Sequence, residues 1–207
     1  MADVTTPASV AAYWDSAAAT FDTEPDHGLA APEVRAAWAR RLREWLPDEG
    51  SAVLDVGCGT GSLSLLLTEQ GHTMTGVDIS RNMVEQARRK LGGRATVVHG
   101  DASAPPVDGP FDVVLSRHLV WTLPNPTAAL RNWVGLLRPG GHLVLVEGRW
   151  AAVSGTADMP WQGGVPADAL TTAVSPLVAR VYVEHLTDPA LWGREITDER
   201  YVLLAHV

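Results

Sequence analysis

The chain has 207 residues, of which 46% are hydrophobic and 19% are charged, and its net charge is −8. This composition is typical of one folded globular domain and excludes an intrinsically disordered chain. The acidic balance argues against a nucleic-acid partner, which requires a basic surface. Cys58 is the single cysteine, which excludes an internal disulfide and a multi-cysteine metal site and is consistent with a reducing, cytoplasmic location; we expect no bound metal. No apolar stretch is long enough to span a bilayer, so we expect no membrane partner.

The first fifty residues predict two helices, over residues 7–21 and 32–46, with a loop at 23–31 between them. Apolar residues fall on one face of each helix: Trp14, Ala18 and Phe21 in the first, and Val34, Trp38, Leu42 and Trp45 in the second.

Short apolar strands then alternate with helices. Strands are predicted over 52–56, 73–77, 96–99, 112–116 and 142–147, and helices over 62–69, 81–91 and 127–137. Such alternation indicates an α/β fold with a doubly wound parallel sheet that has helices on both faces.

The alternation stops near residue 149. A stretch rich in Gly, Ala and Pro follows, too long for a routine connection, and we expect a lid loop over 151–166. A helix over 167–177 and strands over 179–186 and 200–207 complete the chain. We therefore expect a single domain over 1–207, with a helical cap at 1–50, a cofactor-binding core at 51–150, the lid, and a C-terminal helix with two strands at 167–207.

The most informative stretch is V-L-D-V-G-C-G-T-G-S at residues 53–62, where a buried strand ends in alternating glycines. Glycine adopts backbone angles that other residues resist, and it lets a ligand approach the peptide plane. A helix begins directly afterwards, and its N-terminus offers unpaired N–H groups and a partial positive charge. The motif therefore predicts a site for a nucleotide-like cofactor.

Acidic residues at the strand ends narrow the choice of cofactor. Asp78 lies seventeen residues after Gly61, a place from which a carboxylate accepts hydrogen bonds from both ribose hydroxyls. Nicotinamide dinucleotides are bound by G-x-G-x-x-G, whereas the spacing here is G-x-G-x-G and Asp55 precedes the glycines. A carboxylate at that place repels a pyrophosphate and suits an ammonium or sulfonium group. The sequence therefore favours S-adenosylmethionine over NAD.

With these motifs the chain resembles the class I S-adenosylmethionine-dependent methyltransferases of the small-molecule type. The resemblance is carried by residues 55–61, 78–83, 100–102, 111–114, 123–126 and 137–141. It implies a Rossmann-like, seven-stranded, mostly parallel sheet whose last strand is antiparallel. It also implies S-adenosylmethionine as the methyl donor and S-adenosylhomocysteine as the product.

The resemblance assigns roles along the cofactor. Asp55 and Gly57 would lie along its methionine part, Gly59 and Gly61 beside the ribose, and Asp78 on the ribose hydroxyls. Met83, Asp101 and Ala102 would surround the adenine, and the N-terminal helix would close over the ligand. The expected cofactor-binding residues are Tyr13, Phe21, Asp55, Gly57, Cys58, Gly59, Gly61, Asp78, Ile79, Met83, Gly100, Asp101, Ala102 and Arg117.

Simpler alternatives stay open for several of these residues. The alternative is a helix cap for Asp78, a place in the core for Met83, and a turn before two prolines for Asp101. Cys58 reads as a small residue in a tight loop rather than a nucleophile, and Arg117 serves either the cofactor carboxylate or the acceptor.

Transfer of a methyl group from a sulfonium is a one-step displacement that needs the acceptor in line with the breaking bond. Alignment alone supplies about 7–11 kcal/mol of barrier lowering. A base is needed only when the acceptor must lose a proton. His118, just after a strand, is the candidate base, and the alternative is a loop histidine bonded to the backbone.

Eight tryptophans are present. Trp38, Trp45 and Trp133 lie on predicted helix faces and are expected in the core. Four others lie on segments expected to meet at the pocket mouth, where they would form either walls for a planar aromatic or heteroaromatic acceptor or simple lid packing. The expected acceptor-binding residues are Trp14, His118, Trp121, Glu147, Arg149, Trp150 and Trp161.

The prediction is therefore a cytoplasmic enzyme, a monomer or weak homodimer, that methylates an oxygen or nitrogen atom of a small acceptor. Two alternatives remain. One is a non-catalytic S-adenosylmethionine-binding protein or partner-dependent subunit, and the other is an NAD(P)-dependent reductase.

Overall fold

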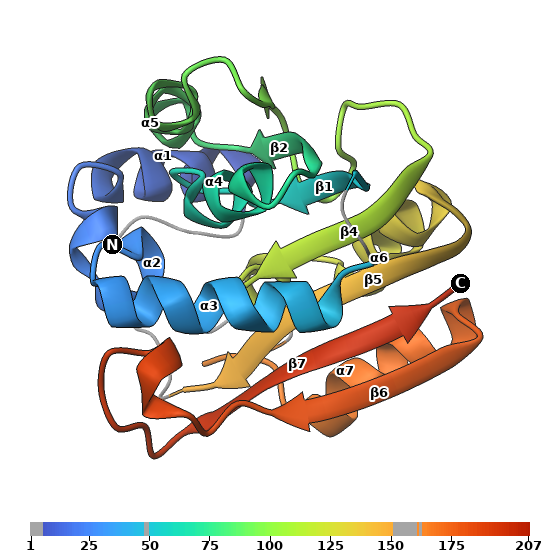
Figure 1. Cartoon of the computed structure of the whole chain (residues 1–207). Coiled ribbons are helices and arrows are strands. Elements are labelled where there is room, and N and C mark those ends of the chain that lie inside the picture. The colour runs from blue at the N-terminus through green and yellow to red at the C-terminus, as the bar shows by residue number, and fades with distance from the viewer. Residues whose placement is uncertain (1–5, 48–49, 151–160, 162) are drawn as a thin grey trace.

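Seven strands form one sheet in the order β3-β2-β1-β4-β5-β7-β6 (Figure 1). The first five strands pair in parallel, whereas β7 is antiparallel to both of its neighbours. The expected doubly wound, Rossmann-like sheet with an antiparallel last strand is therefore confirmed. The strands are β1 (Ala52–Val56), β2 (Thr73–Asp78), β3 (Thr96–His99), β4 (Phe111–Arg117), β5 (Leu137–Arg149), β6 (Arg180–His185) and β7 (Glu199–His206). The computed structural model describes residues 6–47, 50–150, 161 and 163–207.

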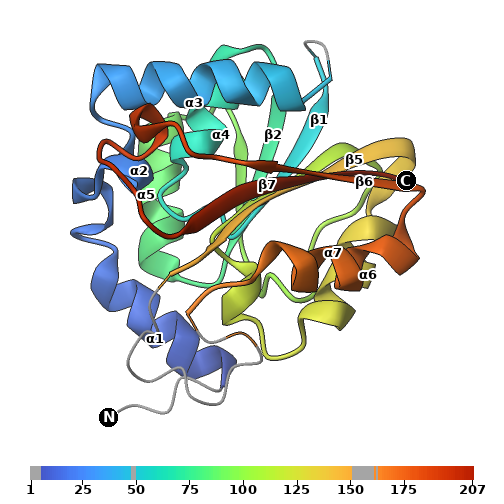
Figure 2. The ribbon, with the colours of Figure 1, turned by 90° about the horizontal axis from the view of Figure 1, so that it is seen from below.

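Helices cover both faces of this sheet. Figure 2 shows α3 and α4 on one face and α6 and α7 on the other. The helices are α1 (Pro7–Ala17), α2 (Pro25–Gly28), α3 (Pro32–Trp45), α4 (Ser62–Glu69), α5 (Arg81–Leu91), α6 (Pro126–Gly135) and α7 (Ala167–Val174). Short 3₁₀ turns occupy η1 (Phe21–Thr23), η2 (Val120–Thr122), η3 (Ser175–Leu177) and η4 (Pro189–Leu191).

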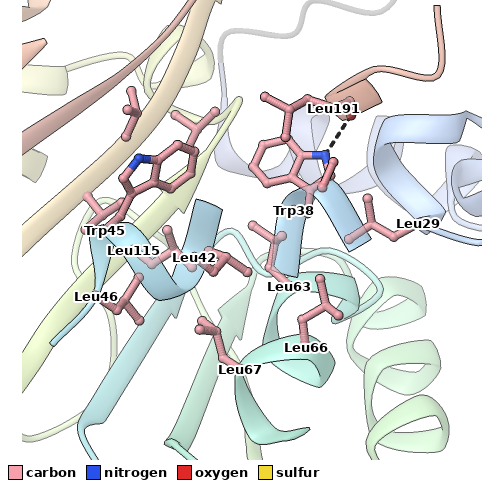
Figure 3. Close-up of a cluster of buried hydrophobic side chains, with 14 of the residues drawn as sticks. Leu29, Trp38, Leu42, Trp45, Leu46, Leu63, Leu66, Leu67, Leu115 and Leu191 are labelled. Atoms are coloured by element: carbon pink, nitrogen blue, oxygen red, sulfur yellow. Dashed lines mark hydrogen bonds between the residues drawn. The ribbon is translucent and has the colours of Figure 1, made fainter. Parts of the chain in front are cut away.

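Successive strand residues point to opposite faces, so each central strand contributes to two separate apolar cores. Val53 of β1 packs beneath α3 and α4, whereas its neighbour Leu54 packs beneath α6 and α7. In the first core, the indole of Trp38 donates a hydrogen bond to the Leu191 carbonyl at 2.7 Å (Figure 3). This bond ties α3 to η4, at the start of the segment that leads into β7. Trp38, Trp45 and Trp133 are all buried, as expected.

The N-terminal cap differs from the prediction at its end. The expected helix over 7–21 ends at Ala17, Phe21 begins η1, and α2 lies inside the expected loop. The hydroxyl of Thr23 donates to the Thr20 carbonyl at 2.6 Å, a local hydrogen bond that competes with a continuous helix. Pro25 follows shortly afterwards and cannot continue a helix that precedes it.

Two further findings concern the described part of the chain. It holds no helix that is both long and apolar enough to cross a membrane. No three of its His, Cys, Asp and Glu side chains gather in a way that would hold a metal ion. The predicted lid falls mostly on residues 151–160 and 162, which lie outside the described residues, and the domain limits stay a prediction.

Candidate active site

A cavity of ≈ 590 Å³ opens at the carboxyl ends of β1, β2 and β4. Its volume lies within the range of about 300–1,000 Å³ that is usual for small-molecule sites. The strand order reverses between β1 and β4, which is where ligands bind in open parallel sheets. The predicted site residues that line it are Trp14, Phe21, Asp55, Gly57, Cys58, Gly59, Asp78, Ile79, Met83, Asp101, Ala102, Arg117, His118, Trp121 and Trp150.

The glycine loop between β1 and α4 forms one wall. Gly57, Gly59 and Gly61 have φ values of +70°, +54° and +80°, which favour glycine over any residue with a Cβ. A Cβ at Gly59 would lie 3.2 Å from the Phe21 ring, so this backbone is closely approached from the cap. A Cβ at Gly61 would instead meet Ala87 of α5. Gly61 therefore serves helix packing and does not line the cavity.

Asp78 is positioned to bind hydroxyl groups of a ligand. Its two carboxylate oxygens accept hydrogen bonds from the backbone N–H groups of Gly59 and Ser80, both at 2.9 Å. Each carboxylate oxygen retains capacity for another hydrogen bond, and the residue lines the cavity. Burial raises the pKa of Asp78. The helix-capping alternative is not needed, because the hydroxyl of Ser80 caps α5 by accepting from Met83.

Asp55 lies deeper, at the end of β1. It is 2% exposed and accepts a hydrogen bond from the Ser64 hydroxyl at 2.6 Å. Burial raises its pKa to about 6, while the Ser64 bond and the positive charge of Arg117 act in the opposite direction. A buried carboxylate of this kind suits an ammonium group, which restores its charged form. The Asp55 carboxylate therefore fits the amino group in the amino-acid part of S-adenosylmethionine.

Three other predicted cofactor-binding residues, Met83, Asp101 and Cys58, line the cavity, and each also has a structural role or property of its own. Met83 is buried and also lines the cavity, so it is both core and wall. Asp101 lines the cavity, and it also forms the expected turn by accepting from the Ser103 N–H at 2.8 Å. Burial raises the pKa of the Cys58 thiol well above its usual value, so it stays protonated and is a poor nucleophile.

The glycine loop, the start of α5 and the carboxylates of Asp55, Asp78 and Asp101 form the side of the cavity that we call the cofactor wall. Polar contacts attach the N-terminal cap to this wall. In α1, a carboxylate oxygen of Asp15 accepts from the Ser80 hydroxyl at 2.6 Å and from the Asn82 N–H at 3.0 Å. In η1, Asp22 forms an ion pair with Lys90 of α5 at 2.8 Å. None of the residues of α1 is buried. Helix α1 is therefore held by polar contacts more than by apolar burial.

The other side of the cavity, which we call the acceptor end, consists of His118, Trp150, Arg194, Asp198 and Arg200. The His118 ring stacks on Trp192 with centroids 6.0 Å apart and planes at 15°, and its centroid lies 5.1 Å from that of Trp150. Its Nε2 atom is buried and has no hydrogen-bond partner among the described residues.

The backbone and charge state of His118 are both unusual. Its φ is +56°, in the left-handed region, which costs a non-glycine residue about 1–2 kcal/mol. Burial holds its pKa well below the usual range, and the charges of Arg117, Arg200 and His27 lower it further. The imidazole is therefore neutral at physiological pH and can accept a proton at one nitrogen.

The segment that leads into β7, together with the first residues of β7 itself, supplies acceptor-end residues that the sequence patterns did not identify. Arg194, Asp198 and Arg200 line the cavity, and Trp192 supports the His118 ring. Because β7 is antiparallel, its first residues lie at the edge where the parallel strands end. Glu24 and His27 of the cap also line the cavity and were missed.

Glu147, expected among the acceptor-binding residues, does not line the cavity. It is fully buried, and its Oε1 atom accepts from the backbone N–H groups of Leu119 and Val120, at 2.9 and 2.7 Å. It therefore holds the loop that carries His118 instead of lining the cavity. Burial raises its pKa to about 8.

Five more predicted residues do not line the cavity. Tyr13 points outward and is 51% exposed, and Arg149 is exposed at the end of β5. Trp161 packs against the core beneath α6 and α7, and Gly100 lies against Pro106. Gly61 faces α5, as described above. Periodicity and strand ends place these residues near the site, but only the paths of the connecting loops decide where each side chain points.

Comparisons with known proteins agree with this geometry. Residues 54–145 match a family described as a methyltransferase domain. A demethylmenaquinone methyltransferase from Staphylococcus saprophyticus is 36% identical over 122 residues, which cover 56% of this chain and 52% of that protein. A ubiquinone biosynthesis O-methyltransferase from Bordetella avium is 31% identical over 141 residues, which cover 65% of this chain and 55% of that protein. The chain thus spans about half the length of the curated relatives it matches.

Among solved structures, the N-methyltransferase NodS from Bradyrhizobium japonicum WM9, in complex with S-adenosylhomocysteine, has a TM-score of 0.70 and 18% sequence identity. The similarity covers 93% of this chain and 97% of that one, so the two share a fold over nearly their whole length. The family match and the sequence relatives together show that residues 54–145 belong to the class I S-adenosylmethionine-dependent methyltransferases. This confirms the family and the cofactor expected from the sequence.

Proposed function

We propose that this protein transfers the methyl group of S-adenosylmethionine to an oxygen or nitrogen atom of a small aromatic acceptor. One observation carries the proposal: a single cavity joins the carboxylates of Asp55 and Asp78 to an aromatic end that contains His118 and Trp150. Support also comes from the relatives, which are named as a demethylmenaquinone methyltransferase and a ubiquinone biosynthesis O-methyltransferase.

On the cofactor side the protein binds and orients S-adenosylmethionine. Asp78 would accept hydrogen bonds from the ribose hydroxyls, and Asp55 would pair with the amino group of the methionine part. Gly57 and Gly59 leave room for close approach to the backbone. When bound, S-adenosylmethionine supplies an electrophilic methyl group on a sulfonium. The protein's contribution is then to hold the acceptor atom in line with that methyl group.

On the acceptor side the chain supplies flat walls and one proton acceptor. Trp121 and Trp150 lie with ring centroids 5.7 Å apart at an interplanar angle of 86°, and they offer both a ring face and a ring edge to a planar molecule. His118 lines the cavity with a neutral imidazole, so it is placed to take a proton from an acceptor hydroxyl as the methyl group arrives, although its lowered pKa makes it a weaker base than an exposed histidine. If His118→Ala kept most of the turnover rate at every pH, a role as the base would be excluded.

The cofactor half is tested by calorimetric titration with S-adenosylhomocysteine, using Asp78→Asn and, as a control, Glu85→Gln on the exposed side of α5. We expect the asparagine to weaken binding by about tenfold or more, because hydrogen bonds to a charged acceptor contribute about 1.5–3 kcal/mol. The control should bind like the unaltered protein. Binding of NADH without binding of S-adenosylhomocysteine would overturn the proposal in favour of a reductase.

The catalytic half is tested by following S-adenosylhomocysteine formation with phenols and aromatic amines as acceptors. Turnover with any of them supports the proposal. Cofactor binding without turnover across both classes would instead favour the non-catalytic or partner-dependent alternative. A small-molecule acceptor, a cytoplasmic location, the absence of a nucleic-acid partner and a monomeric or weakly dimeric state remain predictions from the sequence.

A further inference from the structure

Arg200 is an almost fully buried arginine at the acceptor end of the cavity. It is 8% exposed, and its Cζ atom lies 5.0 Å from the ring centroids of both Trp150 and Trp192. Gly148, its partner across β5 and β7, has no side chain to fill the same space. A guanidinium between two indoles is attracted to both ring faces, so this positive charge is fixed in position.

The guanidinium of Arg200 has hydrogen-bond donors to spare. Its Nε and Nη2 atoms each donate to Asp198 at 2.8 Å. A guanidinium carries five N–H groups, and the other three make no hydrogen bond within residues 6–47, 50–150, 161 and 163–207. Because the residue lines the cavity, these donors are available to a ligand.

Arg194 adds a second cation beside the same carboxylate. It is exposed at the rim of the cavity, and in the described part of the chain it makes no ion pair. The hydrogen bonds from Arg200 lower the pKa of Asp198, and the charges of Arg200 and Arg194 lower it further. Two guanidinium groups therefore act on one carboxylate, which leaves one positive charge unbalanced at the acceptor end.

The neighbouring charges do not cancel this excess. His118 is neutral, and the charges that act on it are those of Arg117, Arg200 and His27. Glu24 is exposed where it lines the cavity, and apart from Asp198 the other carboxylates that line it belong to the cofactor wall. Glu147 also interacts with Arg200, but burial raises its pKa to about 8, so it is mostly protonated at neutral pH. A local cationic end within a chain of net charge −8 is suited to an anionic ligand group.

We infer that the acceptor is an aromatic acid whose carboxylate is bound by Arg194 and Arg200 while its ring lies against Trp150. Guanidinium groups bind carboxylates with charge-assisted hydrogen bonds, about twice as strong as neutral ones. The inference rests on the proposed function, since it specifies the substrate class of the same cavity.

The test uses 3,4-dihydroxybenzoate and 3,4-dihydroxybenzamide, which differ mainly in the charge of one group. Each is titrated calorimetrically into the protein saturated with S-adenosylhomocysteine. We expect the acid to bind at least about tenfold more tightly than the amide, the ratio that corresponds to about 1.4 kcal/mol. Arg194→Met and Arg200→Met should each reduce this ratio, whereas Arg43→Met, which removes an equally charged but distant arginine of α3, should leave it unchanged.

Asp198→Asn should change the affinity for the acid in the opposite direction to the arginine variants. It removes the carboxylate that accepts two hydrogen bonds from Arg200 and offsets part of the positive charge, so the acid should bind more tightly than to the unaltered protein while the amide binds equally well. Purely structural roles for these residues would not produce that gain. An acid that binds no better than the amide, including the case in which neither binds, overturns the inference. S-adenosylhomocysteine binding is measured in the same samples, so a failure there identifies a failure of the proposed function instead.

Discussion

The Nζ atom of Lys90 lies 2.8 Å from a carboxylate oxygen of Asp22, and this contact joins the N-terminal cap to the cofactor wall. Lys90 is the single lysine of the chain. The same Nζ atom also donates to the hydroxyls of Thr60 and Ser62, both at 2.8 Å and both within the glycine motif. One ammonium group thus connects α5, the glycine loop and η1, the turn that begins with Phe21.

Replacing Lys90 should weaken cofactor binding, because the cap would be held less firmly against the glycine loop. We expect Lys90→Met to raise the dissociation constant of S-adenosylhomocysteine about two- to fivefold, since partly exposed ion pairs contribute about 0.2–1 kcal/mol. Stopped-flow fluorescence should assign the change to faster dissociation. Arg89→Met, the neighbouring change on the same helix, is the matched control. Equal dissociation rates for the unaltered protein and Lys90→Met would show that the contact does not hold the cap.

The left-handed backbone of His118 predicts a stability difference between two small replacements. Glycine adopts a φ of +56° without penalty, whereas alanine does not. His118→Gly should therefore be about 1 kcal/mol more stable towards urea than His118→Ala, the reverse of their order at most positions. Both variants remove the imidazole ring, so the comparison isolates the effect of the backbone conformation on stability. If alanine is the more stable of the two, the φ of this residue is not the source of the strain.

The sequence predicted the sheet and the cofactor wall well because both depend on local patterns. Alternating apolar strands and helices determine a doubly wound sheet, and the glycine spacing with Asp55 and Asp78 determines one wall of its cavity. These residues lie at or next to strand ends, so their direction follows from the strand itself.

The acceptor end was harder to predict, because its residues come from connections whose paths are set by tertiary packing. Glu147 lies on β5 as expected, but it points beneath the His118 loop and not into the cavity. Arg200 carries no motif. A signal was available nonetheless: in an antiparallel last strand, the first residues lie at the edge where parallel strands end, so Arg200 was placed at the site by topology alone.

Burial of Glu147 predicts a pH dependence of stability with a definite sign. Its pKa rises from an ordinary value of 4.5 to about 8 in the folded protein. Between these values the folded state binds more protons than the unfolded chain, so this residue lowers stability as the pH rises through that window. Glu147→Gln keeps an oxygen that accepts from Leu119 and Val120, and it has no charge to bury. Compared with the unaltered protein, this variant should therefore gain stability from about pH 5 to pH 8.

Urea unfolding at several pH values measures this gain as the difference in unfolding free energy between Glu147→Gln and the unaltered protein. Asp55 and Asp78 also have raised pKa values, but they are present in both proteins, so their contributions cancel in this difference. The upper limit is about 1.4 kcal/mol for each pH unit inside the window. Glu147→Leu is the second comparison, because it removes the acceptor altogether. It should be destabilised by about 2 kcal/mol or more even at pH 5, since two buried N–H groups lose their partner. Parallel stability curves for the unaltered protein and Glu147→Gln would mean that Glu147 does not titrate in this window, and that its two hydrogen bonds are enough to keep the carboxylate ionised at neutral pH.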